Sequence, residues 1–545
     1  MEKKLKSTIH LNFLSTALKT EYSLLISKGG LYLEIQPLKK DTNKTKFVVA
    51  GLLLGILMAA MDNTIVATAM ATIVGDLGGF DKFVWVTSAY MVATMAGMPI
   101  FGKLSDMYGR KRFYIGGLIL FLFGSALCGT ASSIEQLSIY RAIQGIGGGA
   151  LMPIAFTIMY DIFPPEKRGK MTGLFGAVFG TSSVFGPLLG AYITDYISWH
   201  WVFYINIPLG LISFFFITKY YSESLEFRKQ KIDWAGAITL VISIVCLMFA
   251  LELGGKEYAW NSTVIIGLFT TVVIALIIFF FVERKATEPI ISFHLFKKPL
   301  FAASQGVAFF YGAAFIICTV YIPIFIQGVL GGSASNAGLI LTPMMVGSVI
   351  GSQTGGQLAS RTSYRNIMMV SGVFFVLGIY SLSTLTMDTP RLLVTLFMIL
   401  AGLGVGFSFS VLSMSSIHKL EMRDRGSATS TNSFFRSLGM TLGVTIFGTI
   451  QNHIFTDKLN SVFSPELAKL APKGGDTSFL LSPGATAKIP VEILAGIKEA
   501  LATSIANTFF WALIPAVLSV ICILLMGNER LFTGPKKKEK QKQVS

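Results

Sequence analysis

One carboxylate, Asp62, lies in the middle of a long apolar stretch. It follows Phe47, where the stretch begins, by 15 residues and precedes Asp76 by 14. At 1.5 Å per residue, a helix would place Asp62 roughly 20 Å from either end, near the middle of a bilayer. A carboxylate at that depth costs about 3 kcal/mol, usually faces a cavity and often serves transport. Asp62 is therefore a candidate proton carrier, and the alternative is a structural Asp that is hydrogen-bonded to a neighbouring helix.

Two arginines also lie inside apolar stretches. Arg141 follows Glu135 by six residues, so it would lie about 9 Å inside its helix, with Gln144 on the same face. Its guanidinium either reaches back to the membrane surface or faces an internal cavity. Arg436 lies well inside another stretch, 426–450, where functional and structural pairing are both open.

The elements that position these residues are membrane helices. The chain has 545 residues, of which 52% are hydrophobic and only 14% charged, whereas soluble domains carry about 25% charged residues. A crossing helix needs roughly 20 mainly apolar residues. Fourteen stretches meet this need: 47–74, 84–102, 113–131, 136–160, 169–193, 200–220, 233–252, 263–282, 300–327, 335–358, 364–386, 391–416, 426–450 and 504–526.

The basic residues set the orientation of these spans. Gly102 to Arg112 reads GKLSDMYGRKR, and we expect it to form a tight cytoplasmic turn. Of the 45 Lys and Arg residues, 34 fall on the side of this loop and 8 on the opposite side. The net charge of +16 thus follows the positive-inside rule and does not indicate nucleic-acid binding. Both termini are expected in the cytoplasm.

A repeat divides the chain into two halves. Gly145-Ile-Gly-Gly-Gly149 resembles Gly402-Leu-Gly-Val-Gly406, and each is followed by an Arg-Gly pair 23 residues after its first glycine. Two six-helix bundles related by an axis along the membrane normal form a transporter architecture, with the solute site between them. The expected domains are a tail (1–46), a first bundle (47–220), a linker with two inserted helices (221–299), a second bundle (300–526) with an outer loop (451–503), and a basic tail (527–545).

Four motifs in order resemble the major facilitator superfamily and, within it, the fourteen-helix drug:proton antiporters. They are the loop GKLSDMYGRKR, the run from Met61 to Val66, the run from Arg141 to Gly145, and Ser182-Ser-Val-Phe-Gly186-Pro187-Leu-Leu-Gly190-Ala191. In the last motif Ser182 and Ala191 stand where glycines are usual. The fold class expected is an all-α polytopic membrane protein with the major facilitator fold.

The resemblance assigns roles to the motif residues. It implies proton coupling at Asp62, with Arg141 modulating that acid. It implies a latch between the two halves at the signature loop and a central interface at the fifth-helix motif. The latch residues are Gly102, Asp106, Gly109 and Arg110, and the interface residues are Gly186, Pro187 and Gly190. An ordinary proline kink at Pro187 is the alternative. A weak copy of this loop in the second half, Gly356 to Arg361, has Ser360 in place of the acid. A matching latch there should therefore be weak.

An apolar, adaptable substrate cavity is expected between the halves. Its candidate wall residues are Met58, Ile65, Trp85, Tyr90, Gln144, Phe309, Tyr321 and Gln327. Each aromatic among them can equally face lipid or pack between helices. Acidic residues are absent from the expected second-half helices apart from their ends, so a dicationic drug would find few negative partners there.

The preferred function is proton-driven export of amphiphilic, cationic or neutral organic compounds across the plasma membrane of a prokaryote. Export of one specific metabolite, peptide or lipid-like solute is the alternative. The five histidines show no catalytic spacing, the four cysteines show no metal-ligand spacing, and no phosphate-binding G-x-x-x-x-G-K-[ST] is present. We therefore expect no enzyme activity, metal, cofactor, nucleic acid or obligatory protein partner. The expected partners are the solute, protons and the lipid bilayer.

Overall fold

The structure is a computed structural model that describes residues 22–27, 30–35, 42–78, 82, 84–223, 232–255, 257–331, 334–462 and 491–531. Most of the first tail, residues 463–490 of the expected outer loop and the basic tail from residue 532 lie outside the described residues. So do short gaps in the two bundles and in the linker, among them 224–231.

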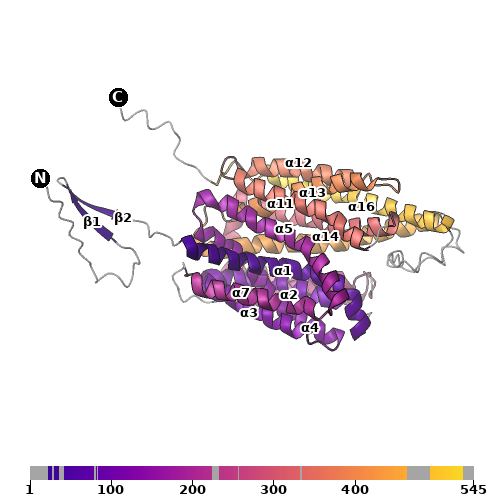
Figure 1. Cartoon of the computed structure of the whole chain (residues 1–545), viewed down its shortest axis with the longest axis horizontal. Coiled ribbons are helices and arrows are strands. Elements are labelled where there is room, and N and C mark those ends of the chain that lie inside the picture. Colours follow the sequence, from indigo (N-terminus) through magenta and orange to yellow (C-terminus); the bar gives the residue numbers. More distant parts are fainter. Residues whose placement is uncertain are drawn as a thin grey trace, which may run out of the picture.

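Long helices form the bundle (Figure 1). The first half holds α1 Thr42–Leu77, α2 Val84–Tyr108, α3 Arg110–Cys128, α4 Ile134–Ile162, α5 Pro165–Tyr196, α6 Trp201–Tyr204 and α7 Asn206–Tyr220. The inserted pair is α8 Trp234–Leu253 and α9 Thr263–Lys285. The second half holds η1 Phe293–Lys297, α10 Pro299–Ile324, η2 Phe325–Val329, α11 Ala334–Leu358, α12 Tyr364–Leu382, α13 Arg391–Ser416, η3 Met422–Asp424, α14 Arg425–Val462 and α16 Val491–Leu524.

All fourteen expected spans coincide with helices, and twelve helices of the described chain are long and apolar enough to cross a membrane. The other two expected spans, 84–102 and 335–358, lie in α2 and α11. Side-chain caps explain several helix starts: Ser133 accepts from the Gln136 amide, and Ser262 accepts from the Ile265 amide.

Three features depart from the expectations. An antiparallel hairpin, β1 Tyr22–Ser27 with β2 Gly30–Ile35, lies in the tail before the helices, so the chain is not wholly α-helical. The signature segment is mostly helical, because α2 continues to Tyr108 and only Gly109, with a φ of 102°, forms the turn. At the far end of the bundle, α14 continues to Val462 and α16 begins at Val491, which shortens the expected outer loop.

The repeat reappears as matched helix pairs. In the first half α4 packs on α2 and α3, and α1 packs on α5 and α7. In the second half α13 packs on α11 and α12, and α10 packs on α14 and α16. Gly145 lies against the Tyr90 carbonyl as Gly402 lies against the Met344 carbonyl. The G-x-x-x-G runs are therefore packing faces that bring helix backbones together.

The halves meet along two helix pairs, α5 with α11 and α2 with α14 (Figure 1). The closest contacts join backbones near the end that carries residues 102–112, which we call the signature end. There Gly102 lies against the Gly426 carbonyl, and Gly169 lies against the Gly356 carbonyl. A side chain at any of these four glycines would separate the helices.

The inserted helices bridge the halves on one flank. Helix α8 packs mainly on α9, and it also contacts α2 of the first half and, more lightly, α14 of the second half. After α9, Glu288 pairs with Lys103 of the first half at 2.6 Å, and the Ile290 carbonyl accepts from Ser427 of the second half at 3.1 Å. The described part of the insertion thus contacts both halves next to the signature end.

Candidate functional site

Two helices, α4 and α7, bring polar side chains to Asp62 of α1, which is fully buried. Arg141 of α4 forms an ion pair with Oδ2 of Asp62. Gln144, one turn further along α4, donates to Oδ1 at 2.7 Å, and Asn206 of α7 donates to the same oxygen at 3.1 Å. We call Asp62, Arg141, Gln144 and Asn206 the acid cluster.

A second set of contacts fixes the donors of the acid cluster. The Arg141 Nη1 donates to Gln144 Oε1 at 2.7 Å, and its Nε donates to the Val86 carbonyl at 3.3 Å. The guanidinium also lies 4.0 Å from the centre of the Tyr90 ring, within cation–π range. Arg141 therefore points inward and does not reach back to the membrane surface. Its sequence signal was its depth in an apolar stretch, whereas nothing in the sequence singled out Asn206.

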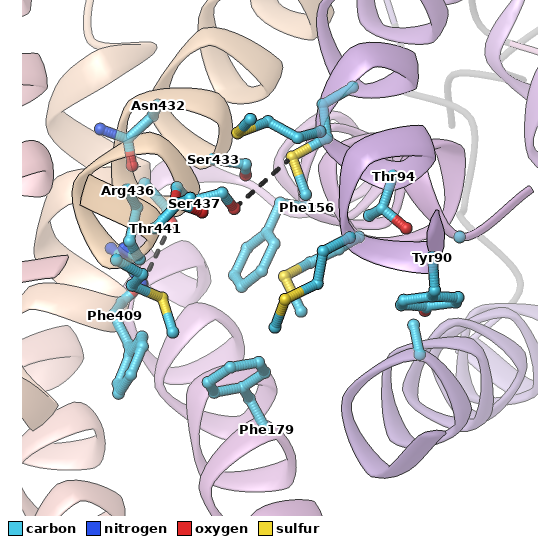
Figure 2. A pocket seen from close by; sticks show the side chains of 18 of the residues that line it. Tyr90, Thr94, Phe156, Phe179, Phe409, Asn432, Ser433, Arg436, Ser437 and Thr441 are labelled. Carbon is cyan, nitrogen blue, oxygen red and sulfur yellow. Dashed lines mark hydrogen bonds between the residues drawn. The ribbon is translucent and has the colours of Figure 1, made fainter. Parts of the chain in front are cut away.

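A central cavity of about 170 Å³ lies between the halves. Methionines and phenylalanines form most of its wall: Met91, Met95, Met98, Met152, Met440, Phe156, Phe179 and Phe409. Helix α14 adds a polar stripe that comprises Asn432, Ser433, Arg436, Ser437 and Thr441. Figure 2 shows this stripe facing Phe156 and Phe179, with Tyr90 and Thr94 on the far wall.

Tyr90 separates the acid cluster from the cavity. Its ring lines the cavity and also stacks on Arg141, whereas Asp62 and Arg141 themselves do not line it. In this conformation the described residues leave the Asp62 carboxylate enclosed within the first half. A proton can reach Asp62 from the cavity only if Tyr90 or a neighbouring side chain moves.

The cavity differs from the one expected. Tyr90 is the only one of the eight candidate wall residues that lines it. Gln144 belongs to the acid cluster instead, Met58 and Ile65 are fully buried, and Trp85 packs on Phe249 of the inserted α8. Phe309, Tyr321 and Gln327 lie elsewhere in the second half, on α10 and η2. Arg436, left open between two roles, lines the cavity.

Asp106 and Arg110 join the halves at the signature end. Asp106 Oδ1 accepts from the Gly426 amide at 2.9 Å, and Oδ2 accepts from the Ser427 amide at 2.8 Å, at the N-terminus of α14. Arg110 is fully buried, pairs with Asp106 at 3.3 Å and donates to the Met422 carbonyl. Asp106 lies beyond the apolar span 84–102, and burial raises its pKa to about 6 although Arg110 and the two amides lower it.

Asp161, which the sequence analysis missed, completes this latch. It lies at the end of α4, forms an ion pair with Arg110 and pairs with Arg425 of the second half at 2.6 Å. Arg425 belongs to the repeated Arg-Gly pair. The corresponding place in the second half differs, because Ser360 donates to the Gln357 carbonyl of its own helix. There Gly356 and Gly169 touch through their backbones.

The fifth-helix motif lies within the first half. Gly186 packs on Thr64 and the Met61 carbonyl, and Gly190 packs on Thr68 and the Ile65 carbonyl, all on α1. Helix α5 continues through Pro187. The contacts of α5 with the second half come instead from its earlier glycines, from Gly169 to Gly180. In this conformation the two glycines pack on the helix that carries Asp62, and the role of the motif in a central interface stays a prediction.

Comparison with known proteins identifies the family. The model of the Major Facilitator Superfamily matches residues 52–444. The chain is 63% identical over 493 residues to Multidrug resistance protein 3 of Bacillus subtilis, covering 90% of this chain and 96% of that protein. It is 37% identical over 525 residues to the multidrug transporter protein MdtP of the same organism, covering 92% and 96%.

A solved structure shares the fold. The proton:xylose symporter XylE, bound to 6-bromo-6-deoxy-D-glucose, superposes with a TM-score of 0.57 at 14% identity, covering 91% of this chain and 98% of that one. Together with the family match over residues 52–444 and the 63% identical relative, this fold shows that the chain belongs to the major facilitator superfamily of multi-pass membrane transporters.

Proposed function

We propose that this protein exports amphiphilic organic compounds, antibiotics among them, across the cell membrane in exchange for protons. The names of its two Bacillus subtilis relatives support drug export. The observation that carries proton exchange is the ion pair of Asp62 with Arg141, buried in the first half beside a cavity between the halves. Family members of this kind work as single chains on small molecules, and no cofactor is part of the proposal.

The proposal includes fourteen membrane crossings, with α2 and α11 lining the interface between the two halves. The excess of Lys and Arg at the signature end favours a cytoplasmic location for that end and for both termini. In the described conformation the halves touch at this end. This conformation would thus be closed toward the cytoplasm, and transport would alternate it with one that opens there.

The acid cluster supplies a mechanism for exchange. A buried ion pair is costly to leave unpaired, so protonation of Asp62 would remove the charge partner of Arg141. Arg141 would then be held by Gln144, the Val86 carbonyl and the Tyr90 ring alone. Because Tyr90 also lines the cavity, a shift of Arg141 would move the Tyr90 ring and change the wall of the cavity where the solute binds.

The Asp62→Asn variant tests this mechanism. Asparagine keeps the size of the side chain and one acceptor but carries no exchangeable proton. We expect proton-driven uptake into energised inverted vesicles, which corresponds to efflux from the cell, to fall at least 100-fold while the protein remains folded in the membrane. The matched control is Asp76→Asn, on the same helix, whose carboxylate accepts from Trp199 at the other end of the span. Protonophore-sensitive efflux at the normal rate by Asp62→Asn would remove Asp62 from the mechanism.

A further inference from the structure

Arg436 brings a positive charge into the central cavity. It lies on α14 within the polar stripe, between Asn432 and Met440 at one turn on either side (Figure 2). Its Nη2 donates to the Ser408 carbonyl at 3.4 Å, and its guanidinium lies 4.7 Å from the centre of the Phe409 ring. These contacts hold the side chain against α13 at the edge of the cavity.

No carboxylate among the described lining residues balances this charge. Asp62, a buried acid of the first half, is already paired with Arg141 and lies behind the Tyr90 ring. The remaining wall consists of methionine, aromatic, hydroxyl and amide side chains. The cavity is therefore positively charged in a region of low dielectric constant, where a charge acts strongly on a neighbouring ion.

The chemistry around Arg436 suits an anion. A guanidinium has five N–H donors in a planar fork that matches a carboxylate. One weak bond to a carbonyl occupies little of this capacity. Ser433 and Ser437 add hydroxyl groups on the same helix, and Met98 and Met152 form an adaptable apolar wall opposite them. An amphiphile with an aromatic body and an acidic group would meet both kinds of surface.

We propose that Arg436 binds the carboxylate, or another anionic group, of amphiphilic substrates and makes the cavity prefer anions over cations. This rests on the proposed export function, because it names the class of compound that is exported. It replaces the charge class expected from the sequence, which was cationic or neutral. The competing role for Arg436 is structural, namely to tie α14 to α13 through the Ser408 carbonyl.

Equilibrium binding of three matched probes tests the preference. They are 1-pyrenebutanoic acid, its methyl ester and 1-pyrenebutylamine, which share one ring system and differ in charge. The full-length protein would be held in nanodiscs of neutral phosphatidylcholine, with binding followed by pyrene fluorescence at pH 7.5. We expect the acid to bind about tenfold more tightly than the amine. Arg436→Gln should weaken binding of the acid about tenfold and leave the ester within twofold.

Two further variants separate charge from structure. Arg436→Lys keeps the charge without the fork and should retain part of the preference. Arg361→Gln removes an exposed positive charge of the second half that does not line the cavity, and it should leave the preference unchanged. Equal binding of the three probes to the unaltered protein would overturn the proposal, as would an Arg436→Gln variant that loses acid and ester alike. Because binding needs no proton gradient, these results are independent of whether Asp62 drives export.

Discussion

At the scale of single residues, three side chains of the acid cluster donate to the carboxylate of the fourth. Arg141, Gln144 and Asn206 all donate to Asp62, and Asn206 also donates to Ser125 at 3.1 Å. A buried hydrogen-bonded network fixes side chains in one arrangement, and loss of one charge leaves the others badly paired. We therefore expect one proton at Asp62 to change the arrangement of the whole network.

We expect removal of the Tyr90 side chain to uncouple proton movement from solute movement. Tyr90→Ala would open the wall between the cavity and Asp62, so that water reaches the carboxylate without solute movement. We expect proteoliposomes with this variant to leak protons several times faster under an imposed pH gradient, read with an entrapped pH-sensitive dye. Tyr90→Phe keeps the ring over Arg141 and should remain tight. A Tyr90→Ala variant as tight as the unaltered protein would show that the ring is not the barrier.

At the scale of elements, the latch uses the end of one helix as a binding site for the carboxylate of another. The first amides of α14 have no partner within their own helix and carry part of the helix dipole, so they favour an anion. Asp106 supplies that anion from the end of α2. Arg110 and Arg425 then share Asp161, which links α3, α4 and α14. The latch thus joins four helix ends from the two halves.

We expect Asp106→Asn to open the signature end. The amide group retains one acceptor but loses the charge that strengthens both bonds and pairs with Arg110. Each charge-assisted bond contributes about 1.5–3 kcal/mol, so the open population should rise about tenfold or more. Spin labels at Lys170→Cys and Arg361→Cys, which are exposed near the Gly169–Gly356 contact, would report longer distances between the halves.

Ser360→Ala is the matched control for the latch, because Ser360 stands at the corresponding place and bonds only within its own helix turn in the described chain. It should leave the distance distribution unchanged. If Asp106→Asn also leaves it unchanged, the carboxylate does not hold the halves together.

At the scale of the whole molecule, the two halves have the same packing but different chemistry. The positions 257 residues after Arg141 and Gln144 are Met398 and Ala401, so the second half has no copy of the donors that α4 supplies to Asp62. The second half instead supplies Arg436 to the cavity. The proposed proton site and the proposed anion site thus lie on opposite halves, and we expect their separation to change during transport.

This division predicts how transport depends on the membrane potential. If one proton enters for each monoanion exported, two charges move in the same electrical sense, and each contributes about 2.3 kcal/mol per 100 mV. Efflux of 1-pyrenebutanoate should then respond to the potential about twice as steeply as efflux of its neutral ester. Proteoliposomes with the potential set by potassium and valinomycin would measure both slopes. Equal slopes would contradict a single shared proton site.

Much of this architecture was predictable because it depends on local chemistry. The helices follow from apolar length. Each expected range coincides with helical segments, although α14 and α16 extend beyond theirs, and twelve helices of the described chain are long and apolar enough to cross a membrane. The repeat follows from glycine spacing, and the packing of Gly145 and Gly402 confirms it. Asp106 and Arg110 were predicted to interact, but Asp161 was missed. Its partners lie at the starts of α3 and α14, which are far apart in the sequence.

The cavity wall was not predictable in the same way. Which face of a membrane helix meets the cavity depends on the rotation of the helix about its axis, and packing sets that rotation, since lipid and protein interior are equally apolar. Phe309 and Trp85 therefore looked as suitable as Phe156 and Phe409, although only the latter two line the cavity. The sequence by itself determined the spans, the duplication and the buried charges. Only the tertiary structure decided that Asp62 is enclosed with Arg141 while Arg436 lines the cavity between the halves, because only it brings distant helices together.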